Sequence, residues 1–170
     1  SSVAAPFDAE LSLGVLGDDL DPVIAQYIAK HLHLSELIEL YFAEPSESPV
    51  QGVAGVVITA RSVAWREAKI PLSRLESVAV QCDGYERLYA EVSAGGELFV
   101  LPILEALPTL LLAETLARVS PRRQLWVGPR ATRRLRAELT PMLSRFARTA
   151  LSRNDGGDPA RRAIRMVRYY

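Results

Sequence analysis

The arginine side chains in the last third of the chain are the residues best suited to chemistry with a partner molecule. Residues 121–170 contain thirteen arginines and three acidic residues, a net charge of +10, whereas residues 1–60 contain nine acidic residues and one lysine, a net charge of −8. A guanidinium group is a planar fork of donors that matches carboxylate and phosphate oxygens. The charge pattern therefore predicts directed ion pairing at two opposite ends, which the overall net charge of zero conceals.

The arginines expected to contact a partner fall into two groups. The first is Arg133, Arg134, Arg136, Arg145 and Arg148, and the second, near the C-terminus, is Arg161, Arg162 and Arg165. Their expected complements are Glu36, Glu39 and Glu44, in the same chain or in another copy. A protein contact is the favoured use of these arginines. Anionic lipid, a merely solvated face and, least favoured, nucleic acid are the alternatives, because all of them would use the same side chains.

Metal and acid–base chemistry has little support in the sequence. His31 and His33 are two positions apart, so on a helix they point in different directions, and no third ligand accompanies them. Asp18, Asp19 and Asp21 lack the alternating pattern and the closing glutamate of a calcium loop. Helix capping is their expected role. We therefore expect no metal site and no cofactor.

Nucleophilic and nucleotide chemistry are equally unsupported. Cys82 has no sequence neighbour that would activate it, and it is expected to be a small buried side chain. Gly95-Gly96 fits a hairpin turn and Gly156-Gly157 a linker better than either fits a phosphate cradle. Trp65 and Trp126 fit core or edge packing better than ligand stacking. We expect a protein that is not an enzyme, and a small hydrolase with an unseen site is the least favoured alternative.

The cellular location is predicted from what the sequence lacks. The single cysteine excludes an internal disulfide, and no stretch approaches 18 uninterrupted apolar residues, so no transmembrane segment is predicted. The first residues have neither the basic nor the apolar part of a signal peptide. The cytoplasm is the expected location, with peripheral membrane attachment as the alternative.

Residues 1–49 are predicted to form an acidic, mainly helical region. Asp21-Pro22 is a helix-start signal, because the carboxylate accepts from free backbone amides and proline loses no hydrogen bond at the first helical position. Apolar residues then recur at helical spacing as far as Leu32, and a second helical stretch is expected over residues 35–41. The proline-rich run 44–49 is expected to be a surface loop.

Residues 50–119 are predicted to form an antiparallel meander followed by a helix. β-Branched runs and alternating patterns indicate about five strands, over residues 53–59, 62–66, 76–82, 87–92 and 97–101. Asp83-Gly84 and Gly95-Gly96 supply the reversals. Leucines at helical spacing over residues 107–119 predict a helix that lies across the sheet.

Residues 120–170 are predicted to form a basic helical region. Residues 124–127 suit a short extended piece, and a long apolar stripe follows Gly128-Pro129 with the arginines largely outside it. Thr140-Pro141 is expected to kink or restart this helix. The three regions are expected to pack as one compact unit.

The middle of the chain resembles bacterial pleckstrin-homology-like and GRAM-like domains. The likeness rests on the apolar strand that ends at Thr59, the aromatic strand that ends near Trp65, and the Ile70-Pro71-Leu72 entry into a strand that ends at Val78. It extends over about residues 50–119. Members of that family are generally binding modules for phospholipid head groups, proteins or their own copies, so the resemblance implies binding rather than catalysis.

Together these patterns predict an α+β protein with a sheet of pleckstrin-homology-like type between charged helical regions. The expected function is non-enzymatic recognition or assembly through charge-assisted contacts with a protein partner or in a homo-oligomer. Peripheral binding to anionic phospholipid is the main alternative.

Overall fold

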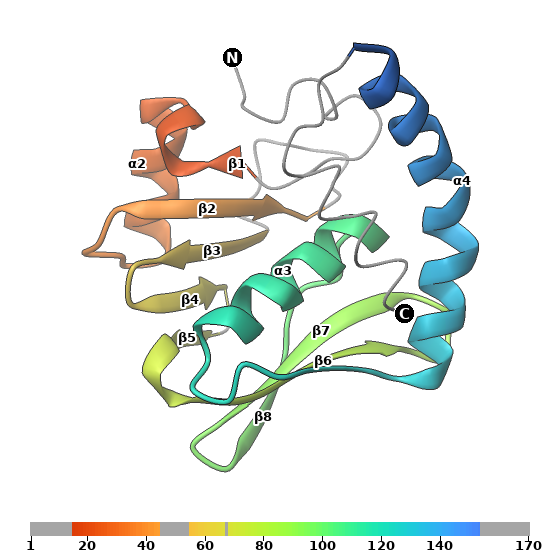
Figure 1. Cartoon of the computed structure of the whole chain (residues 1–170). Coiled ribbons are helices and arrows are strands. Elements are labelled where there is room, and N and C mark those ends of the chain that lie inside the picture. The colour runs from red at the N-terminus through yellow and green to blue at the C-terminus, as the bar shows by residue number, and fades with distance from the viewer. Residues whose placement is uncertain (1–14, 45–54, 67, 154–170) are drawn as a thin grey trace.

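A computed structural model gives an α+β protein with two β-sheets and three α-helices among its described residues (Figure 1). These residues are 15–44, 55–66 and 68–153, and for residues 142–153 only the helical backbone is described. The predicted α+β class is therefore confirmed. None of the helices in this part of the chain has both the length and the apolar character needed to cross a membrane.

The first sheet contains five antiparallel strands in the order β1-β2-β3-β4-β5. They are β1 (Val15–Leu16), β2 (Ile38–Ala43), β3 (Gly55–Thr59), β4 (Ser62–Trp65) and β5 (Ala68–Pro71). The Thr59 hydroxyl closes the β3–β4 turn, because it accepts from the backbone N–H groups of Ser62 at 3.0 Å and Arg61 at 3.2 Å. The predicted hairpin over residues 53–66 is thus confirmed for its described part.

The second sheet contains four strands in the order β8-β7-β6-β9. They are β6 (Leu75–Cys82), β7 (Leu88–Ala94), β8 (Glu97–Val100) and β9 (Leu125–Val127). β6, β7 and β8 form an antiparallel meander, whereas β9 pairs with β6 in parallel. Gly95 and Gly96 both have positive φ in the β7–β8 turn, a conformation that suits glycine.

Three helices pack on these sheets. They are α2 (Pro22–His31), α3 (Ala106–Val119) and α4 (Pro129–Arg153), with short 3-10 turns η1 (Gly17–Asp19) and η2 (Leu72–Arg74). Asp21 caps α2 as predicted, because its Oδ1 accepts from the backbone N–H of Val23 at 2.8 Å. α3 lies against β6 and β7 (Figure 1), which confirms the predicted helix across the sheet.

Two hydrophobic clusters hold the elements together. The main core joins both sheets, α3 and the first turns of α4, and Val63, Val80, Leu112 and Leu139 in it have no exposed surface. The smaller cluster packs Ile28 of α2 against the other face of the first sheet. β3 and β4 are therefore buried on both faces, which explains why they are continuous apolar runs in the sequence.

Two sequence-based expectations are wrong, and one alternative of a third is excluded. The helical stretch expected over residues 35–41 is instead occupied largely by β2, because Leu40 and Phe42 pack on the main core while Tyr41 faces α2. The expected single meander is divided between two sheets, and β5 is an additional strand. Of the kink or restart expected at Thr140-Pro141, the restart does not occur, because the final helix is continuous through Pro141.

Candidate interaction surface on helix α4

Helix α4 is held against the protein by one buried stripe. Pro129 occupies its first position, and the backbone N–H of Thr132 donates to the Gly128 carbonyl at 2.8 Å. Ala131, Leu135 and Leu139 follow at intervals of four residues, and all three are buried in the main core. This stripe fixes the rotation of the helix and therefore decides which arginines face solvent.

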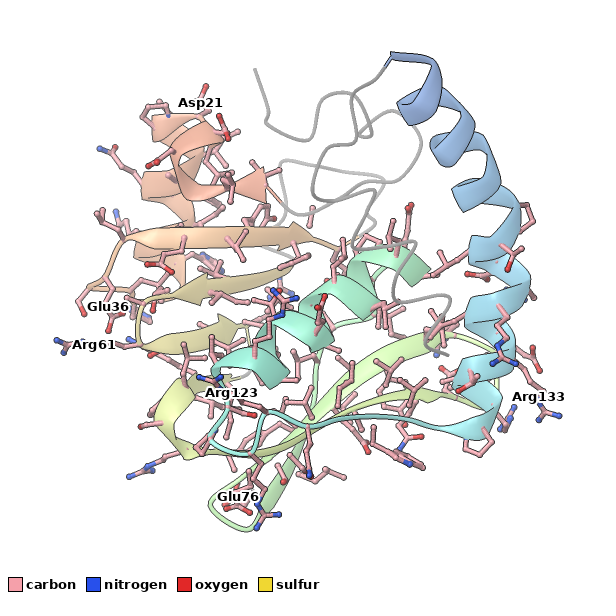
Figure 2. The ribbon with its side chains drawn as sticks, in the orientation of Figure 1. Asp21, Glu36, Arg61, Glu76, Arg123 and Arg133 are labelled. Carbon is pink, nitrogen blue, oxygen red and sulfur yellow. The ribbon has the colours of Figure 1, made fainter. Side chains whose placement is uncertain are left out.

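Arg133 and Arg136 lie on the exposed side of α4. Neither side chain forms an ion pair or a hydrogen bond with any residue that the structure describes. Figure 2 shows the Arg133 side chain on the outer side of the helix, directed away from the sheets. Being three positions apart, the two residues are neighbours on the helix surface. The helix thus presents two guanidinium groups that have no partner in the described part of the chain.

The neighbouring arginines of α4 already have partners. Arg134 pairs with Glu138 one turn further along the helix, and its Nε is buried without an acceptor. Arg130 lies 3.9 Å from Oε1 of Glu86 and donates to the Asp83 carbonyl at 3.4 Å. The guanidinium group of Arg134, predicted to contact a partner, therefore already pairs with a carboxylate of its own chain. Arg130 was missed by sequence reasoning, and it ties α4 to the β6–β7 turn.

A cavity of about 330 Å³ lies beside this helix. It is lined by Glu86, Arg87, Leu88, Ile103, Leu104, Glu105, Ala106, Leu107, Pro108, Arg134 and Glu138. Leucine, isoleucine, alanine and proline side chains form its apolar part, and both arginines in its lining already have a carboxylate partner. No activated nucleophile and no acid–base pair converge there.

The β6–β7 turn next to the cavity is held by one carboxylate. Asp83 accepts from the backbone N–H groups of Arg87 at 2.8 Å and Tyr85 at 2.9 Å, and its Oδ2 lies 2.8 Å from Arg87 Nε. The backbone hydrogen bond from Arg87 is the largest cause of a lowered pKa at Asp83. The Arg87 guanidinium also lies 5.2 Å from the centre of the Tyr85 ring. This network gives the cavity rim a defined shape.

The acidic residues expected to complement the arginines lie in the first sheet and in the turn before it. Glu36 faces Lys69 of β5, with 3.8 Å between Oε2 and Nζ. Glu39 is exposed on β2, and Glu44 follows the end of that strand. Burial raises the pKa of the Tyr41 hydroxyl, and the Glu44 carboxylate raises it further.

The acidic and basic groups do not meet within the described part of the chain. Figure 2 shows Glu36 and Arg133 on opposite sides of the molecule, with the main core between them. The sequence allows the acidic and basic groups to pair within one chain or between two copies. Glu36 and Arg133 do not pair within one chain. Arg133 and Arg136 therefore have no acidic partner among residues 15–44, 55–66 and 68–153.

Several predicted contact residues lie beyond the described side chains. Arg145 and Arg148 belong to the helical backbone of α4, but their side chains are not described. Arg161, Arg162 and Arg165 lie outside the described residues altogether.

The residues considered for catalysis or metal binding are dispersed. His31 stacks on Tyr27, with 5.9 Å between ring centres, and His33 follows α2 with a φ of 54°. Cys82 is half-buried against the main core. Trp65 is buried, whereas Trp126 is exposed on the edge strand β9. Within residues 15–44, 55–66 and 68–153, no three potential ligands among His, Cys, Asp and Glu gather into a metal site.

Comparison with known proteins adds no assignment. No family model matches the chain, and no curated protein and no solved structure matches it either.

Proposed function

We propose that this protein is a non-enzymatic recognition module that binds acidic groups of a protein partner through the exposed arginines of α4. The observation that carries the proposal is the contrast along that helix. Arg133 and Arg136 are unpaired among the described residues, whereas Arg130 and Arg134 have carboxylate neighbours. Guanidinium groups left free on a fixed helix are preorganised for carboxylates.

The charges of the surroundings favour a protein over a membrane. Glu86, Glu105 and Glu138 line the cavity on the same helix as these arginines or beside it. An anionic lipid surface would repel these three carboxylates. A protein partner avoids this repulsion by placing an apolar or basic side chain at the cavity and carboxylates at Arg133 and Arg136.

The pleckstrin-homology-like resemblance is part of the same proposal. The order of meander and helix in β6, β7, β8 and α3 supports it, since the likeness implies a helix after the strands. We also propose that the protein acts in the cytoplasm.

Binding to a defined acidic peptide tests the proposal directly. A fluorescein-labelled decaglutamate peptide is titrated with the protein and followed by fluorescence anisotropy at low and at physiological salt. We expect saturable binding that weakens with salt. The double variant Arg133→Glu and Arg136→Glu should raise the dissociation constant by about tenfold or more, because two favourable charge pairs become repulsive.

The matched control reverses two exposed arginines elsewhere. Arg61 and Arg74 are exposed and have no ion pair with a described residue, so Arg61→Glu with Arg74→Glu changes the net charge equally. Figure 2 shows Arg61 on the side of the molecule opposite Arg133. The control should bind the peptide nearly as well as the wild type. An equal loss in both variants would mean that only net charge matters and would reject the α4 surface.

Vesicles distinguish the lipid alternative. The protein is sedimented with vesicles of phosphatidylcholine that contain phosphatidylserine. Sedimentation that depends on Arg133 and Arg136, without peptide binding, would replace the protein partner by a membrane surface.

A further inference from the structure

The four sheet edges of the described structure differ in how they are protected from pairing with another chain. Edge strands expose unpaired backbone groups, and proteins guard them with short length, charge or proline. β1 has two residues, and β5 carries the exposed Lys69 and ends at Pro71. β9 has three residues and lies between the exposed Arg123 and Arg130.

β8 is as short as β5, with four residues, but beyond its first residue it carries neither a charge nor a proline. Its sequence is Glu-Leu-Phe-Val, with its single charge at the first position and no proline before Pro102. Leu98 and Val100 expose 64% and 57% of their surface. Figure 1 shows β8 at the lower rim of the second sheet, with no labelled element beyond it. An edge strand whose last three residues are apolar, two of them largely exposed, favours strand pairing.

The hydrogen-bond pattern shows which backbone groups of β8 have no partner among the described residues, and these are called its free groups below. The N–H of Leu101 donates to the Ala90 carbonyl at 2.9 Å, which makes residues 101 and 90 a hydrogen-bonded pair. Bonded and non-bonded pairs alternate along an antiparallel ladder. Phe99 therefore bonds to Val92, and the N–H and C=O groups of Leu98 and Val100 point away from β7.

These free groups are complementary to themselves. If two β8 strands pair antiparallel about a twofold axis at Phe99, Leu98 of each copy lies opposite the other copy's Val100. Each such pair exchanges two backbone hydrogen bonds, so the four free groups of each strand are all satisfied. Glu97 then lies opposite the second copy's Leu101, so no like charges face each other.

Phe99 makes β8 a firm platform for this pairing. Its side chain lies on the face opposite to Leu98 and Val100 and packs edge-on against Trp65, with 6.4 Å between ring centres. The strand is therefore anchored to the main core while its edge stays open. An extra strand would join a sheet that is already ordered.

We infer that β8 is the dimerisation edge of this protein, at which a second copy of the chain adds its own β8 to form a continuous eight-stranded sheet. This surface is separate from the arginines of α4, so the inference does not rest on the proposed function. The second copy is the favoured occupant because the donor and acceptor pattern of β8 is complementary to itself, and because the same register places no like charges opposite each other.

Paired charge variants test the register of this contact. Sedimentation equilibrium over a concentration series should show a monomer–dimer equilibrium for the wild type. Leu98→Lys with Val100→Lys should raise the dimer dissociation constant by about tenfold or more, because lysines then face lysines, and Leu98→Glu with Val100→Glu should do the same. An equimolar mixture of the two variants should restore dimers, because each lysine faces a glutamate.

Hydrogen exchange tests the same contact in the wild type, so its result does not depend on whether a variant folds. The amides of Leu98 and Val100 should exchange more slowly as the concentration rises, whereas the Phe99 amide, bonded to β7, should be protected throughout. A wild type that stays monomeric up to its solubility limit would overturn the inference. So would a dimer that survives in both folded charge variants, or one in which Leu98 and Val100 gain no protection, since another surface would then hold the copies together.

Discussion

Arg87 closes the β6–β7 turn on Asp83, with its Nε 2.8 Å from Oδ2 and its backbone N–H 2.8 Å from Oδ1. One carboxylate thus fixes both the main chain and the side chain of the residue four positions later. The turn carries Glu86, which faces Arg130 of α4. The geometry of the candidate surface therefore depends on a short-range contact in a different element.

The ionisation of Asp83 should make the stability of this turn depend on pH. Its pKa is lower in the folded protein than in the unfolded chain, so its contribution is complete above the unfolded pKa and is lost as the pH falls through the folded pKa. Replacing Asp83 by asparagine should lower the unfolding temperature at neutral pH. The deficit should shrink as the pH falls below the ordinary carboxyl range, because the wild type loses this contribution as its Asp83 carboxyl becomes protonated. Thermal unfolding by circular dichroism measures both, and a deficit that grows in acid would contradict the assignment.

The central helix α3 should be the part of the core most sensitive to truncation. Leu112 has no exposed surface, so Leu112→Ala leaves a cavity among side chains from both sheets. We expect a loss of about 2–5 kcal/mol in the free energy of unfolding, measured by urea titration. Val119→Ala is the matched control, because Val119 lies in the same helix but is exposed. Equal losses would mean that α3 is not central to the core.

Much of the local structure follows from the sequence, because local rules decide it. Asp21-Pro22 starts α2 and the leucines after Leu107 form α3, since capping and helical spacing act over a few residues. The same rules predict the wrong structure for residues 35–41, which were expected to be helical. Their apolar residues fit a helix as well as they fit a strand that is covered on both faces.

The arrangement of the sheets depends on contacts that are distant in the sequence. Nothing local to Trp126 shows that β9 pairs with β6 in parallel, or that the chain divides into two sheets after β5. For the candidate surface, composition indicated arginines on α4 but did not separate the free Arg133 from the paired Arg134. That distinction requires the position of Glu138 and the rotation imposed by Leu135 and Leu139.

Gly55 should tolerate no side chain, because β2 passes too close. A Cβ atom there would lie 2.4 Å from the carbonyl oxygen of Phe42, a backbone atom that cannot move without separating β2 from β3. Gly55→Ala should destabilise the protein by about 1–3 kcal/mol in a urea titration. Gly84→Ala is the control, because nothing lies within 4 Å of the added atom. If both variants unfold at the same urea concentration, the close approach of the two strands is wrong.

Arg133 and Arg134 are adjacent in sequence but should respond differently to the same substitution. Arg134→Ala removes the pair with Glu138 and should lower the free energy of unfolding by about 0.3–1 kcal/mol, while acidic-peptide affinity changes little. Arg133→Ala removes an exposed side chain without a described partner, so stability should stay within about 0.5 kcal/mol of the wild type while peptide binding weakens. Urea titration and anisotropy on the same samples separate the two effects. If Arg134→Ala weakened binding as much as Arg133→Ala at unchanged stability, then Arg134 would belong to the contact surface, and its pair with Glu138 would have to open when the partner binds.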